Sequence, residues 1–204
     1  MILTIVGGAS GVGKTSLLKQ TDSKAKQINT GTLFKKHMVL NKRDDVRKGD
    51  WSAYEPGVMN DLSNFVLVSF QRGEDVIIDT HFAAKIYGKN YRIGLKEKYL
   101  FDFGMFVFNI IKTDTLIQVV LITADPHALL NRRRLDKSRD RELVLSDCYN
   151  DLRSNDVYST RYSREISRAF QKFGSTGRDN IRYHRVENND FKAALINLKN
   201  ILGG

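Results

Sequence analysis

The chain has 204 residues, of which 41% are hydrophobic and 27% charged, with only 2 prolines. This balance is typical of a folded globular protein and excludes a disordered or fibrous chain. The length suits one domain, so we expect residues 1–204 to form a single one. No run approaches the ~20 apolar residues of a membrane span, and we expect no membrane association.

The net charge and the cysteine content indicate which class of partner the chain binds and where in the cell it works. The formal net charge of +10 favours polyanionic partners, either nucleotides or nucleic acid, while a solvated surface rich in Lys and Arg is the alternative. Cys148 is the only cysteine, so an intrachain disulfide is impossible. The apolar start leads into a glycine turn where a cleavable signal would lie, and we therefore expect a cytoplasmic protein.

Short apolar runs alternate with helical patterns along the chain. A strand is predicted at residues 3–6, followed by a glycine-rich turn and a helix that opens at 14–20. Further strands are predicted at 75–79, 116–123 and 180–186, and helices at 33–40, 58–70, 96–112, 126–135, 143–173 and 190–202. This alternation predicts an α/β fold, a three-layer sandwich around a central parallel sheet of about five strands.

Two of these helices begin with a capping signal. Asp125 precedes Pro126, and this order suits a helix start because Asp accepts from the free amides while Pro fits the first helical position. Asn189 or Asp190 is expected to cap the last helix in the same way.

A phosphate-binding motif, the P-loop, occupies the glycine-rich turn at residues 8–15. Its pattern, G-x-x-x-x-G-K-[ST], follows a predicted strand and precedes a predicted helix, which is the context that the motif requires. Its glycines let successive amides point at phosphate oxygens, its lysine reaches the β- and γ-phosphates, and its hydroxyl residue ligates Mg²⁺. The residues predicted to bind ATP are Gly8, Ala9, Ser10, Gly11, Val12, Gly13, Lys14, Thr15 and Ser16.

An acidic residue is expected beside this loop. Asp79 ends the second strongly apolar strand, and the carboxyl ends of neighbouring parallel strands meet at one edge of the sheet. Asp79 is therefore predicted to join Thr15 in holding Mg²⁺ and to take part in catalysis with Lys14. The alternative for Asp79 is a cap for the segment that follows the strand.

With these features in place, the chain resembles the nucleoside monophosphate kinases, most closely the archaeal type of adenylate kinase. Four segments carry the resemblance, in the family's order: GASGVGKT at 8–15, INTGTLF at 28–34, VIIDTH at 76–81 and RRRLDKSRDR at 132–141. The resemblance covers most of the chain, and its first segment is highly specific. It implies Mg²⁺-dependent transfer of the γ-phosphate of ATP to a nucleoside monophosphate, with AMP first among the acceptors.

The resemblance also implies an acceptor site. It makes residues 28–70 or thereabouts the monophosphate-binding segment, puts Thr30 and Gly31 near the acceptor nucleoside, and puts His81 beside the transferred phosphoryl group or the acceptor. A local hydrogen-bonding role is the alternative for His81. The resemblance also implies that the main chain of residues 187–190, which follow the last predicted strand, meets the adenine.

The acceptor segment departs from the better-known adenylate kinases at one position. They place an arginine after it to hold the acceptor phosphate, whereas this chain has Lys35. A lysine cannot give the planar two-pronged grip of a guanidinium. Lys35 is still expected to contact the acceptor, with Arg43 or Arg47 available to supply the grip, and an exposed helix face is the alternative.

A mobile lid at about residues 132–160 is the last element that the resemblance implies. Guanidinium groups from such a lid stabilise charge on the transferring phosphoryl group and displace water. A basic helix end that faces RNA or solvent is the alternative. The arginines predicted to be catalytic are Arg132, Arg133, Arg139 and Arg141, and Arg153 and Arg161 could complete the lid.

Several alternatives stay open. The stretch 82–115 matches the family poorly, and its phenylalanines favour a core or a subunit interface over a base-stacking platform.

The main rival function is an ATPase bound to RNA or ribosome precursors, as in the adenylate-kinase-like ATPases of ribosome maturation, and the net charge favours it. A kinase for another small acceptor or a polynucleotide 5′ end is a third. A homo-oligomer is also open, because archaeal adenylate kinases are trimers.

Overall fold

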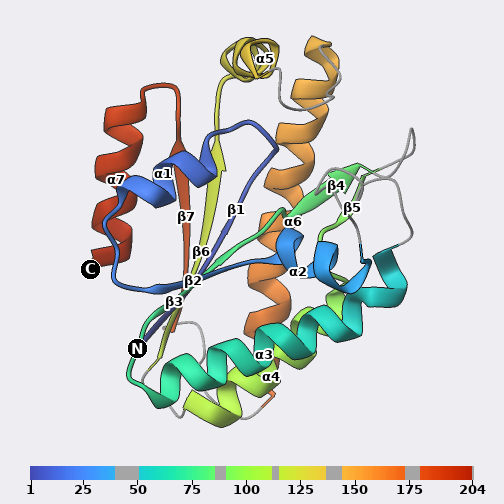
Figure 1. The fold of residues 1–204 in the computed structure, drawn as a ribbon, viewed down its shortest axis with the longest axis vertical. Coiled ribbons are helices and arrows are strands. Elements are labelled where there is room, and N and C mark those ends of the chain that lie inside the picture. The colour runs from blue at the N-terminus through green and yellow to red at the C-terminus, as the bar shows by residue number, and fades with distance from the viewer. Residues whose placement is uncertain (40–50, 86–90, 112–114, 137–143, 173–179, 204) are drawn as a thin grey trace.

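A five-stranded parallel sheet forms the centre of the molecule (Figure 1). The computed structural model describes residues 1–39, 51–85, 91–111, 115–136, 144–172 and 180–203. The strands, in the order β2-β3-β1-β6-β7, are β2 (Lys26–Asn29), β3 (Val76–Asp79), β1 (Ile2–Gly7), β6 (Leu116–Thr123) and β7 (Ile181–Glu187). The predicted α/β class with a parallel sheet is confirmed.

Helices cover both faces of this sheet. Helices α1 and α7 lie on one side, and α2, α3, α4 and α6 lie on the other, while α5 follows β6 at the carboxyl edge (Figure 1). The helices are α1 (Lys14–Gln20), α2 (Thr30–His37), α3 (Glu55–Gln71), α4 (Glu97–Ile111), α5 (Pro126–Leu135), α6 (Leu145–Gln171) and α7 (Phe191–Gly203), with a 3₁₀ turn η2 (Trp51–Tyr54) before α3.

Alternate residues of the strands build two hydrophobic cores. In β1, Ile5 packs into the core that contains α3, α4 and α6, whereas Val6 packs into the core that contains α1 and α7. In β3, Ile78 and Ile77 divide in the same way. Because both faces are buried, the central strands are almost continuously apolar, which is what made them visible in the sequence.

Most predicted elements agree with the structure, and three strands were not predicted. The strand at 116–123 and the helix at 126–135 have the predicted bounds. Strand β2 escaped prediction because Lys26 and Gln27 are exposed at the edge of the sheet. The two-stranded antiparallel hairpin β4–β5, formed by Ala83–Lys85 and Tyr91–Ile93, has strands too short to show a pattern.

Both predicted caps are present. The Oδ1 atom of Asp125 accepts from the amides of residues 127 and 128, at 2.8 and 3.1 Å. Asp190 Oδ1 accepts from the amide of Ala193 at 2.9 Å. Asn189 has another use, since its Oδ1 accepts from the amide of Asp125 at 2.6 Å and so joins the starts of α5 and α7.

The aromatic residues of the poorly matching stretch lie mostly in the core, as expected. Phe103 of α4 is buried, and Phe106 stacks beside it. Phe108 packs edge-on against Phe170 of α6, with ring centroids 5.2 Å apart. The rings of these residues therefore join α4 to α6 in the core.

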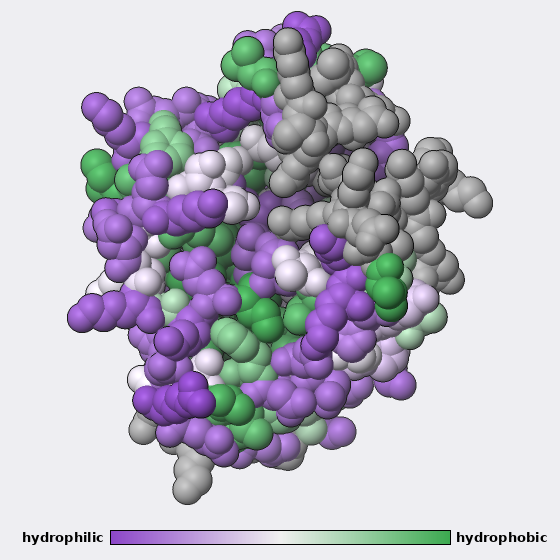
Figure 2. Space-filling view, viewed as in Figure 1, coloured by the Kyte–Doolittle hydropathy of each residue, from purple (hydrophilic) through white to green (hydrophobic). Residues whose placement is uncertain are grey.

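Hydrophilic side chains dominate the face of the molecule in Figure 2, with smaller hydrophobic areas between them. Several basic side chains of the surface form ion pairs, among them Arg185 with Asp156 and Lys199 with Asp22, both at 3.0 Å. In the part of the chain that the structure describes, no helix has the length and apolar character needed to cross a membrane.

One ion pair lies inside the protein and joins the hairpin to α3. The side chain of Glu55 is fully buried and pairs with Arg92 of β5, whose side chain is 22% exposed. Arg92 also donates to Ser52 Oγ at 3.4 Å. A buried charge is tolerated only when it has such partners.

Substitution Glu55→Gln should lower the free energy of unfolding by about 3 kcal/mol, because it removes the buried charge with which Arg92 and Lys96 pair. Urea unfolding followed by circular dichroism measures the change. Asp22→Asn is the control, since it removes an ion pair that is exposed on both sides and should leave stability almost unchanged. Equal effects of the two substitutions would contradict the structural importance of the Glu55 pair.

Candidate active site

The loop between β1 and α1 needs glycine at defined positions. Gly13 has a φ of 93°, and a Cβ there would lie 2.5 Å from Nδ2 of Asn188. Gly8 has a φ of 150°, and a Cβ there would collide with the carbonyl oxygen of Ile122. Backbone conformation and close packing therefore both require these two glycines of the motif.

Side chains bind three carbonyl groups of this loop. The carbonyl oxygen of Gly8 accepts from Nζ of Lys14 at 2.9 Å and from Nδ1 of His81 at 2.8 Å. A carbonyl can only accept, so Nδ1 of His81 carries the hydrogen. Nζ of Lys14 lies 3.4 Å from this nitrogen, and the two donors share one acceptor.

The carbonyl groups of Ser10 and Val12 also accept hydrogen bonds from side chains. Ser10 O accepts from Nε and Nη2 of Arg133, at 3.1 and 2.9 Å. Val12 O accepts from Nδ2 of Asn188 at 2.7 Å and from Nη1 of Arg132 at 3.3 Å. In a trans peptide the N–H of the following residue points the opposite way. Fixing these carbonyls therefore aims the intervening amides as an anion-binding loop requires.

A cavity of about 410 Å³ opens in front of the loop. It brings together predicted residues of the loop, the end of β3 and α5, together with Asn188 from the stretch expected near the adenine, and adds Asp136 and Phe191, which were not predicted. Its lining residues are Ser10, Gly11, Gly13, Lys14, Thr15, Ser16, Asp79, His81, Arg132, Asp136, Asn188 and Phe191. The predicted ATP-binding residues Gly8, Ala9 and Val12 belong to the same loop but are not among those that line the cavity.

Oxygen ligands suited to Mg²⁺ face this cavity. Asp79 is 8% exposed, and its Oδ2 accepts from Nδ2 of Asn29 at 2.6 Å, which fixes the carboxylate. Thr15 is exposed and lines the same cavity. Magnesium is commonly bound by one or two protein oxygens together with water and phosphates, and this pair fits that mode. The described residues hold no cluster of three His, Cys, Asp or Glu side chains that would suit a metal.

The four predicted catalytic arginines have different surroundings. Arg132 lines the cavity and also donates to the carbonyl of Asn188. Arg133 is only 5% exposed and is not among the lining residues. Burial lowers the pKa of Arg132. Arg139 and Arg141 lie outside the described residues.

The two arginines predicted to complete the lid lie on α6. Arg161 pairs with Glu97 at 3.3 Å, and its guanidinium lies 5.1 Å from the ring centroid of Tyr158. Arg153 is exposed. Neither is among the residues that line the cavity.

The predicted acceptor residues begin at the end of β2, next to the end of β3. Thr30 Oγ1 donates to Oγ1 of Thr80 at 3.0 Å. Asn29 caps α2 by accepting from the amide of Thr32 at 3.0 Å. Gly31 and Lys35 are half-buried in this helix. Of the predicted acceptor residues only His81 lines the cavity, and Arg43 and Arg47 lie outside the described residues.

No family model matches the chain, but curated proteins do. The adenylate kinase of Thermoplasma acidophilum is 31% identical over 174 residues, which are 82% of this chain and 79% of that protein. The adenylate kinase of Pyrococcus abyssi is 30% identical over 152 residues, 69% of each chain. The chain belongs to the adenylate kinase family. The resemblance inferred from four motifs is thereby confirmed.

Solved structures agree on the fold of this adenylate kinase family member. Shikimate kinases from Bacteroides thetaiotaomicron and Acinetobacter baumannii superpose with TM-scores of 0.50 and 0.52, each at 14% identity. The alignments cover 100% and 99% of this chain and 99% and 93% of theirs. At this identity the likeness shows the P-loop kinase fold alone.

The side chain of Asn188 lies in the candidate site, but the motifs did not predict its contact with the loop. It is 1% exposed, bonds the P-loop through Val12, and would meet a Cβ at Gly13. Its stretch, 187–190, was expected to meet adenine through the main chain because of its place in the family. A single Asn after a strand carries no pattern of its own, so this bond could not be predicted from the sequence.

Substitution Gly13→Ala should weaken ATP binding by roughly tenfold or more, because the left-handed backbone is strained by a Cβ and Asn188 must move. Calorimetric titration with ATP measures the loss. Gly73→Ala is the matched control, since Gly73 has a φ of 71° with nothing within 4 Å of an added Cβ. It should lose about 1 kcal/mol of stability with ATP affinity unchanged, whereas equal losses of affinity would contradict the local explanation.

Proposed function

We propose that this member of the adenylate kinase family transfers the γ-phosphate of Mg²⁺-bound ATP to AMP. The observation that carries the proposal is that one cavity combines Lys14 and Thr15 of the P-loop with Asp79 and His81 from the end of β3. Such a cavity offers a phosphate-binding loop, a carboxylate and a hydrogen-bonding side chain to the same ligand. The names of the archaeal relatives support AMP as the acceptor.

On the donor side, the P-loop amides and Lys14 would bind the β- and γ-phosphates, with Thr15 and Asp79 as ligands of the metal. When bound, Mg²⁺ offsets the negative charge of the phosphates. Lys14 is already buried, with Nζ on the carbonyl of Gly8, so little side-chain order has to be gained on binding. Catalysis would rest on positioning and electrostatics, because phosphoryl transfer needs little covalent help from the protein.

On the acceptor side, Thr30, Gly31, Lys35 and His81 would contact the monophosphate, within a binding segment at about residues 28–70. The hydrogen bond from Thr30 to Thr80 supports this assignment. Thr80 stands between Asp79 and His81 in the chain, so the start of the segment is tied to the wall of the donor cavity.

The arginines would complete the site. Arg132 supports this role because it lines the cavity. Arg139 and Arg141 stay assigned to the transferring phosphoryl group, and the lid at about residues 132–160 stays part of the proposal. Arg133 is buried and is not among the residues that line the cavity, so it would have to leave Ser10 and Asp151 to reach the transferring group.

Purified protein mixed with Mg²⁺-ATP and each nucleoside monophosphate in turn should form diphosphate selectively from AMP. Lys14→Ala should lower kcat/KM by roughly 10²–10³-fold, because it removes a preorganised charge at the transferring group. Lys19→Ala is the control, since Lys19 is exposed on the same helix, and should leave the rate unchanged. Full activity of Lys14→Ala would contradict the proposed donor site.

Chelation with EDTA should abolish this activity, and excess Mg²⁺ should restore it. Asp79→Asn should raise the Mg²⁺ concentration needed for half-maximal rate by roughly tenfold, because it removes a charged ligand or its support. Asp156→Asn, which removes the partner of Arg185 on the surface, should leave the Mg²⁺ dependence unchanged. Equal Mg²⁺ dependence in Asp79→Asn and wild type would contradict the assignment of Asp79.

The rival function, an ATPase bound to RNA or ribosome precursors, keeps one supporting observation, the net charge of +10. The same assay separates the two functions when free phosphate is followed beside diphosphate. Slow phosphate release that is indifferent to every monophosphate, with salt-sensitive RNA binding, would favour the rival. Activity on another small acceptor or a polynucleotide 5′ end would favour the third candidate function, a kinase with that acceptor. A cytoplasmic location and a homo-oligomer remain part of the proposal.

A further inference from the structure

Arg133 stands beside Arg132 in α5, yet its guanidinium serves the protein and not the cavity. Two of its nitrogens, Nε and Nη2, donate to the carbonyl of Ser10 at 3.1 and 2.9 Å. Nη2 also pairs with Oδ2 of Asp151 in α6. The side chain is 4% exposed, and its charge is matched by that of Asp151. Its hydrogen-bonding capacity is largely used on protein groups.

The carbonyl that Arg133 holds controls an amide of the site. Ser10 and Gly11 share one planar peptide, in which the carbonyl and the N–H point in opposite directions. With the Ser10 oxygen fixed on Arg133, the N–H of Gly11 is directed to the other side, and Gly11 lines the cavity. A charged donor that makes two bonds holds this peptide more firmly than a neutral one.

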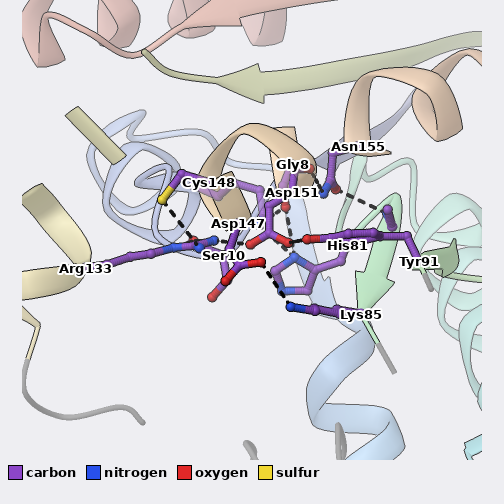
Figure 3. A network of polar contacts seen from close by, with 12 residues as sticks. Gly8, Ser10, His81, Lys85, Tyr91, Arg133, Asp147, Cys148, Asp151 and Asn155 are labelled. Atoms are coloured by element: carbon purple, nitrogen blue, oxygen red, sulfur yellow. Dashed lines mark hydrogen bonds and ion pairs between the residues drawn. The ribbon is translucent and has the colours of Figure 1, made fainter. Parts of the chain in front are cut away.

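The other carboxylate oxygen of Asp151 is hydrogen-bonded to the β4–β5 hairpin. Oδ1 accepts from the hydroxyl of Tyr91 in β5, and Figure 3 shows Tyr91 and Arg133 approaching Asp151 from opposite sides, with Ser10 beside the guanidinium. Burial and the hydrogen bond to Asp151 raise the pKa of Tyr91 far above its usual range, so the hydroxyl keeps its proton and stays a donor. Asp151 therefore joins a strand of the hairpin to the arginine behind the P-loop.

Neighbouring contacts show that this link is one of a set. Asp147, Asp151 and Asn155 lie one turn apart on α6, and each binds the hairpin (Figure 3). Asp147 pairs with Lys85 at 3.1 Å, and Asn155 Oδ1 accepts from the amide of Ala83 at 3.2 Å. Of the three, Asp151 also forms an ion pair with Arg133. Asp151 therefore connects the hairpin to the arginine that binds the P-loop.

We propose that Arg133, held by Asp151 and Tyr91, is a positioning residue that aims the Gly11 amide of the P-loop and makes ATP affinity depend on how the β4–β5 hairpin is seated. The inference rests on the proposed function only in that the P-loop binds ATP. It does not depend on which acceptor is used, and it gives the stretch that matches the family poorly a part in the donor site.

The test compares two tyrosines that fasten the same strand. Tyr91→Phe removes the hydroxyl that binds Asp151. Tyr158→Phe is the matched control, because the Tyr158 hydroxyl donates to the carbonyl of Tyr91 at 3.3 Å and, among the described residues, forms no hydrogen bond with Arg133 or Asp151. ATP affinity is measured by calorimetry without acceptor, melting temperature is recorded for each protein, and KM is then determined for both substrates.

Tyr91→Phe should weaken ATP binding by roughly threefold to tenfold and Tyr158→Phe by less than about twofold, because only the first is coupled to the P-loop. KM for the acceptor should stay unchanged in both. Equal ATP affinities of the two variants would overturn the proposal, even when their melting temperatures differ. A wild-type protein that fails to bind ATP would instead contradict the proposed function.

A second comparison asks whether the effect passes through Arg133. Arg133→Lys keeps the charge but loses the two-pronged grip on Ser10, and it should weaken ATP binding by roughly tenfold. Adding Tyr91→Phe to Arg133→Lys should then cost little more, because the two changes break one path. Fully additive losses, or a lower kcat with unchanged ATP affinity in Arg133→Lys, would overturn the positioning role.

Discussion

The P-loop can turn its amides toward a phosphate only if the carbonyls that point the other way find hydrogen-bond donors. In this chain the carbonyls of Gly8, Ser10 and Val12 all find them in side chains. The donors outside the loop are His81, Arg132, Arg133 and Asn188. The anion-binding shape of the loop is therefore not a local property of its glycines. It depends on three segments far away in the sequence.

Sheet order explains how these segments come together. Strand β1 lies between β3 and β6, and all three run parallel. In the register of the sheet Val6 stands beside Asp79 on one side and beside Val120 on the other. The residues that follow each strand therefore emerge at one edge, next to the P-loop. The hydrophobic cores that fix this register are consequently part of what shapes the site.

Local patterns predicted much of this arrangement. The P-loop was predictable because its residues are contiguous, and the central strands because both of their faces are buried. The directions of individual side chains were not predictable. Arg132 and Arg133 are neighbours on a helix, where successive residues point about 100° apart, and only Arg132 of the two lines the cavity. Which of them faces the cavity depends on how α5 is placed, and that is a tertiary property.

The same limit applies to the parts that were missed. Strand β2 has two exposed polar residues, and the hairpin strands have three residues each, so neither shows a period. Asn188 and Asp151 are single polar residues whose partners lie far away in the chain. Their value comes from contacts that only the folded chain creates.

The spacing of Asp147, Asp151 and Asn155 on α6 has a consequence for how this protein can vary. Because each binds the hairpin from successive turns of one helix, a single residue inserted between them would rotate part of the set by about 100°. Extra residues between β4 and β5 would leave those contacts in phase. Changes in length are therefore better tolerated between the two strands than within the helix that binds them.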